Sequence, residues 1–208
     1  MQRGRHFFVA DYGMQVNIAS RYEIKNYAVE GRDYRFINGD IPILHEWNPT
    51  QISYLWLHFP IWLFLKINGG IAGIYLVFRY LFTVCWISSS LFLFARLRKL
   101  NFYGAAAASL IQLIYIPYGV MALYYNTIGI MTLTASLAIF ITAQKHFRIQ
   151  YILAGFLYAI AVTCSPFLAV GYIAVLLFVL IRRRDLLSKL GFATIGISAC
   201  AVIFILYY

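Results

Sequence analysis

From residue 51 onward, the chain is a series of long apolar segments separated by short clusters of basic residues. A helix of about 20 apolar residues is long enough to cross the ~30 Å hydrocarbon core of a bilayer. The composition agrees, because 62% of the residues are hydrophobic and only 12% are charged. We therefore predict an all-α integral membrane protein, a multi-pass helical bundle, and not a soluble globular domain.

The position of the basic residues explains the formal net charge of +10. They gather at the ends of apolar segments, chiefly at 96–99, 145–148 and 182–189. This distribution is typical of the cytoplasmic loops of membrane proteins and unlike a nucleic-acid-binding face. We expect membrane lipids as partners, and no nucleic acid.

Beyond residue 70 we expect six transmembrane helices. Their approximate ranges are 71–95, 103–125, 128–143, 149–163, 167–181 and 190–208. Pro117 and Gly119 should kink the second of them. The fourth and fifth are joined through Pro166, so they form either one long kinked helix or a hairpin.

The positive-inside rule favours the hairpin. An even number of crossings must separate basic clusters that share the cytoplasmic side, and the segments around Pro166 supply two crossings only as a hairpin. Pro166 and Gly69 are then expected outside the cytoplasm. Segment 52–67 is short, about 24 Å as a helix, and contains His58 and Pro60. We favour a surface helix, which leaves the preceding residues extracytoplasmic; a full crossing would make them cytoplasmic.

Residues 1–51 form a polar head, which contains all the acidic residues of the chain except Asp185. Within it, 14–31 mixes apolar and charged residues at roughly helical spacing, which predicts a short amphipathic surface helix. Glycines and prolines in 31–49 predict a loop. The expected divisions are therefore the extracytoplasmic head 1–51, a juxtamembrane surface helix at 52–67, and the transmembrane part 71–208.

Carboxylates next to a bilayer suit general-base catalysis or metal-assisted transfer. Two stand out by position: Asp11 at one edge of the head, and Glu46 just before the chain returns to the membrane. The alternative is that both are ordinary solvated acids. Arg79 lies early in the 71–95 helix, where a buried cation is costly. It either meets an anionic partner or extends to the membrane surface.

Several short motifs carry a family resemblance. In the head they are Ala10-Asp11-Tyr12-Gly13, Ala19-Ser20-Arg21, Glu30-Gly31-Arg32-Asp33-Tyr34, Asn38-Gly39-Asp40-Ile41-Pro42 and His45-Glu46-Trp47-Asn48-Pro49. Together they resemble the first external loop of the C-type membrane glycosyltransferases, which include protein mannosyltransferases and lipid A aminoarabinose transferases. Tyr125-Asn126-Thr127 and Cys164-Ser165-Pro166 are similar to the next helices of that family. Trp47 and Ser165 depart from it, because the family often has basic residues there.

The resemblance implies transfer of a sugar, with inversion, from a polyprenyl-phosphate donor to an extracytoplasmic acceptor of the cell envelope. Asp11 would deprotonate the acceptor hydroxyl, Glu46 would hold the acceptor or a divalent metal ion, and Arg79 would meet the lipid phosphate. The further substrate contacts that it implies are His45, Trp47 and Asn48.

Family members also have a helix before the aspartate, so we expect this chain to be a fragment of a longer protein of the plasma or inner membrane. The alternative function is non-catalytic: a transporter or an envelope-assembly subunit.

Overall fold

The computed structural model describes residues 53–69, 73–117, 121–143, 148–182 and 186–207. Within these ranges the chain is helical and contains no strand, as the apolar segments predict. The helices are α2 (Tyr54–Asn68), α3 (Ile74–Leu97), α4 (Phe102–Ile114), α5 (Tyr125–Thr142), α6 (Arg148–Cys164), α7 (Leu168–Arg182) and α8 (Leu187–Tyr207).

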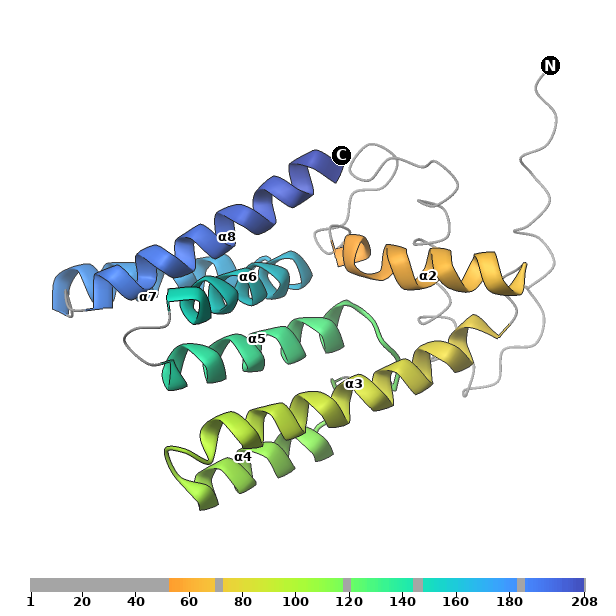
Figure 1. Cartoon of the computed structure of the whole chain (residues 1–208), viewed down its shortest axis with the longest axis horizontal. Coiled ribbons are helices and arrows are strands. Elements are labelled where there is room, and N and C mark those ends of the chain that lie inside the picture. The colour runs from red at the N-terminus through yellow and green to blue at the C-terminus, as the bar shows by residue number, and fades with distance from the viewer. Residues whose placement is uncertain (1–52, 70–72, 118–120, 144–147, 183–185, 208) are drawn as a thin grey trace.

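From α3 to α8 the helices alternate in direction (Figure 1), with α5 packed on α3 and α6, and α8 packed on α6. As a result the bundle has two distinct ends. We call one the basic end, where α3 finishes and α6 and α8 begin, marked by Arg96, Arg148 and Lys189. We call the other the α2 end, where α2 lies beside the first turns of α3 (Figure 1).

Three of the described helices are long and apolar enough to cross a membrane: Ile74–Leu97, Tyr125–Thr142 and Leu187–Leu206. Three shorter apolar helices accompany them: Phe102–Ile114, Arg148–Cys164 and Leu168–Ile181. The outward faces of α3, α4, α7 and α8 carry exposed leucine, isoleucine, valine and phenylalanine side chains. An outer surface this apolar is suited to hydrocarbon and would be unstable in water.

Around Pro166 the structure has a hairpin and not one kinked helix. Helix α6 ends at Cys164, and α7 begins at Leu168. The Tyr158 hydroxyl donates a hydrogen bond to the Leu168 carbonyl at 2.7 Å, and its ring lies 5.7 Å from that of Tyr172. These contacts join the last turns of α6 to the first turns of α7.

The expected helix 103–125 is shorter in the structure. Helix α4 ends at Ile114, and Tyr115 takes an extended conformation with φ −73° and ψ 111°. Pro117 explains the early end, because proline lacks the N–H that helix continuation needs and its ring clashes with the preceding turn. Its carbonyl accepts a hydrogen bond from the Tyr124 hydroxyl at 3.0 Å. Helix α5 accordingly begins at Tyr125, earlier than the expected residue 128.

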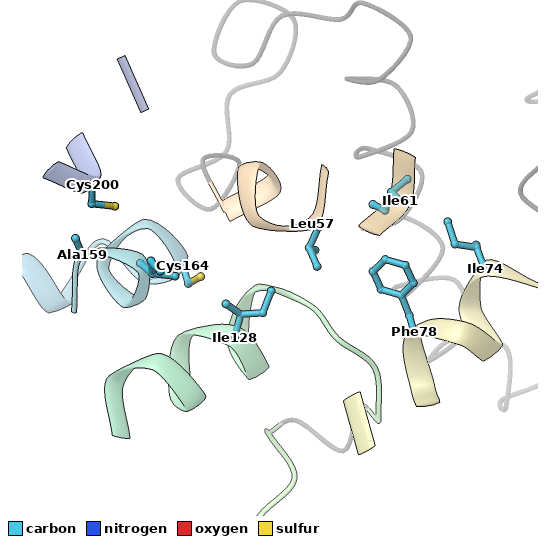
Figure 2. Close-up of a cluster of buried hydrophobic side chains, with 9 residues drawn as sticks. Leu57, Ile61, Ile74, Phe78, Ile128, Ala159, Cys164 and Cys200 are labelled. Carbon is cyan, nitrogen blue, oxygen red and sulfur yellow. The ribbon is translucent and has the colours of Figure 1, made fainter. Parts of the chain in front are cut away.

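Apolar side chains pack helix α2 against the rest of the bundle. Leu57 and Ile61 are almost fully buried, and they project from α2 toward Phe78 of α3 and Ile128 of α5 (Figure 2). The rest of this buried cluster is Ile74, Ala159, Ile160, Cys164 and Cys200. The helix ends at Asn68 and is capped by Gly69, whose φ of 70° is a left-handed conformation that glycine adopts without strain.

Helices α6 and α8 approach each other through two glycines. A Cβ atom on Gly155 would overlap the carbonyl of Ala193, and one on Gly196 would overlap the carbonyl of Ile152. Small residues allow this close backbone contact, which is a common basis of helix association in membranes.

We predict that Gly155→Ala and Gly196→Ala each destabilise the bundle by about 1–3 kcal/mol, the usual cost of overpacking. The free energy of unfolding in detergent measures this. Gly191→Ala is the matched control on α8, because a Cβ there meets nothing within 4 Å; it should be neutral or slightly stabilising. Equal stability of the Gly155 and Gly191 variants would contradict the close contact.

Candidate functional site

Arg79 is the one predicted site residue within the described ranges, and it lies on the outside of α3 near the α2 end. The buried face of α3 is formed by Ile74, Phe78, Phe82, Trp86, Ser90 and Leu93. Arg79 lies about 100° around the helix from Phe78, off the buried face, and is exposed. It is five residues beyond Ile74, or about 7.5 Å along the helix axis, so its guanidinium can reach the membrane surface.

The surroundings of Arg79 are aromatic. Its guanidinium carbon lies 5.4 Å from the ring centre of Tyr75, one turn earlier. This is a cation–π contact, which supports a cation on an otherwise apolar surface. Thr83, one turn later, donates a hydrogen bond to the Arg79 carbonyl at 3.0 Å. We expected Arg79 either to meet an anionic partner or to extend to the membrane surface. Its exposed position is compatible with both, because lipid headgroups lie at that surface.

Lys66 is a second cation at this end, and we did not expect it as a site residue. Its ammonium lies 4.3 Å from the ring centre of Trp62 on the same helix, and Trp62 in turn stacks on Phe59 with ring centres 6.2 Å apart. The sequence contained the signal, because lysine four residues after tryptophan places the two side chains together on a helix. Among the described residues, Lys66 and Arg79 are the basic side chains of the α2 end.

A hydrogen bond connects α2 to the α6–α7 hairpin. The Trp56 indole N–H donates to the Thr163 hydroxyl at 2.8 Å, and the Trp56 ring lies edge-on to Phe156 at 6.4 Å. Two residues along α2, burial lowers the pKa of His58 below its ordinary value, because desolvation disfavours the charged imidazole. These contacts fix the start of α2, into which the polar head leads, against the tip of the hairpin.

The remaining predicted site residues lie outside the described residues: Asp11, His45, Glu46, Trp47 and Asn48. The described ranges contain no aspartate or glutamate, and within them no three His, Cys, Asp or Glu side chains gather as metal ligands would. Of the predicted site residues, the structure therefore places Arg79 alone.

No family model, curated protein or solved structure matches the chain. The glycosyltransferase resemblance therefore rests on the motifs alone.

Proposed function

We propose that this chain belongs to a membrane glycosyltransferase that moves a sugar from a polyprenyl-phosphate donor to an acceptor at the α2 end of the bundle. The observation that carries the proposal is the position of Arg79, an exposed cation at the same end of the bundle at which the head enters α2. Glu46 precedes Ser53 by seven residues, so the chain holds it within about 25 Å of the start of α2.

The proposed orientation follows from the charges. Arg96 lies near the end of α3, and Arg148 and Lys189 lie near the starts of α6 and α8, so all three share the basic end, which the positive-inside rule assigns to the cytoplasm. The α2 end and the head are then extracytoplasmic, with α2 at the outer surface of the plasma or inner membrane. Donor phosphate at that surface would lie at the level of Arg79.

The proposed chemistry is a single displacement. Asp11 accepts the proton of the acceptor hydroxyl, and the acceptor oxygen bonds to the anomeric carbon as the bond from that carbon to the phosphate oxygen breaks. Polyprenyl phosphate leaves, and the sugar is transferred with inversion. Arg79 stabilises the negative charge that develops on the phosphate, which is the type of interaction that lowers such barriers most.

Glu46 holds the acceptor in this proposal, while His45, Trp47 and Asn48 contact the substrates. A divalent metal ion held by Glu46 would supply further charge stabilisation.

Replacing Arg79 tests the phosphate contact. Arg79→Leu should weaken binding of polyprenyl phosphate by about 10- to 150-fold, the value of a hydrogen bond to a charged group, while Arg79→Lys should weaken it less. Binding can be measured by titrating purified protein with a fluorescent polyprenyl phosphate. Lys99→Leu, at the opposite end, removes the same charge and should have no effect. Unchanged binding in Arg79→Leu would show that the side chain only extends to the surface.

Replacing the head carboxylates tests the reaction itself. In the full-length protein, Asp11→Asn should slow sugar transfer by roughly 100-fold or more, because the amide cannot accept the proton. Glu46→Gln should lower the rate by a similar factor. Glu23→Gln and Glu30→Gln are the matched controls in the head and should be nearly silent. Full activity in Asp11→Asn would contradict the transferase proposal and favour a non-catalytic membrane protein.

A further inference from the structure

Cations from three helices lie around the first turn of α6 at the basic end. Arg96 of α3 donates a hydrogen bond through Nη2 to Gln150 Oε1 at 3.3 Å. The Lys189 ammonium of α8 lies 5.9 Å from the ring centre of Tyr151. Arg148, in the same turn as Gln150 and Tyr151, lies with its guanidinium carbon 5.4 Å from the ring of Phe192 on α8. We call Arg96, Arg148 and Lys189 the three-cation cluster.

The described part of the chain offers this cluster no carboxylate, because it contains no aspartate or glutamate. Arg96 Nε is buried and finds no hydrogen-bond partner among the described residues. The positive charge of the described residues at the basic end therefore favours binding of an anion.

An apolar groove begins beside the cluster. A cavity of about 100 Å³ lies between α5, α6, α7 and α8. Leu190, which lines it, follows Lys189 directly, and Ala154, which also lines it, is one turn beyond Tyr151. A second cavity, of about 360 Å³, continues toward the α2 end and shares with the first the lining residues Tyr158, Tyr172 and Ile197.

The groove is suited to a hydrocarbon chain. Its tyrosine hydroxyls are engaged within the protein, Tyr158 with the Leu168 carbonyl and Tyr172 with Thr194. The rest of the lining is nearly all carbon. Along α8 the two cavities extend from Leu190 to Phe204, about 21 Å, which exceeds half the ~30 Å thickness of a hydrocarbon core.

We propose that the basic end binds one anionic glycerophospholipid, with its phosphate at the three-cation cluster and one acyl chain in the groove beside α7. Charge complementarity selects this occupant, because arginine and lysine are the usual partners of phosphate. Basic pockets between membrane helices commonly take such headgroups. The site lies at the opposite end from Arg79 and does not depend on the proposed transferase function.

Lipid competition on the purified protein tests the proposal. Native mass spectrometry should show phosphatidylglycerol retained about 25-fold more strongly than phosphatidylcholine, as expected for two surface bases at about fivefold each. Arg148→Gln/Lys189→Gln should remove this preference. Arg98→Gln/Lys99→Gln is the matched control, since both side chains are exposed at the same end, and it should change retention less than about fivefold.

Three results would overturn the proposal. If the Arg148/Lys189 and Arg98/Lys99 double variants lost phosphatidylglycerol retention equally, retention would depend only on the general surface charge of this end. Equal retention of the two lipids by the unaltered protein, a result that requires no folded variant, would exclude a headgroup site. Displacement of phosphatidylglycerol by glycerol 3-phosphate at similar concentrations would show that phosphate alone is recognised and that the groove takes no acyl chain.

Discussion

Apolar side chains on the outer faces of the helices impose the constraint on which the rest of the structure depends. Hydrocarbon can cover these faces without cost, and within it every backbone polar group must be bonded inside the protein, which selects helices. The same constraint restricts charged side chains to the two ends of the bundle. Lys66 and Arg79 occupy one end and the three-cation cluster the other, so recognition of charged substrates or lipids is restricted to these two ends.

Much of the described fold could be predicted from the sequence, because charge and length carry the information. The hairpin at Pro166 followed from the spacing of basic clusters, before any contact was known. The end of α4 at Ile114 was missed, although Pro117 was visible, because a continuous apolar run resembles one long span. The close contacts between α6 and α8 at Gly155 and at Gly196 could not be predicted, since a sequence does not show which helix faces a glycine.

The candidate site was predictable to a smaller extent. Arg79 was predicted as a site residue from its position near one end of a span, and its exposure and its tyrosine partner were new. The roles of Asp11 and Glu46 stay predictions, because both lie outside the described residues. The three-cation cluster depends on α3, α6 and α8 meeting in space. Sequence alone indicated only that these bases share one side of a membrane.

The central claim is that the α2 end and the basic end face opposite sides of one membrane. Single cysteines at Ser165, Lys99 and Ser188, in a variant without the native cysteines, test it through labelling of intact cells or right-side-out vesicles with an impermeant maleimide. We predict that Ser165→Cys is labelled from outside, and that Lys99→Cys and Ser188→Cys are labelled only after permeabilisation. Labelling of Ser165→Cys and Lys99→Cys from the same side would contradict the account.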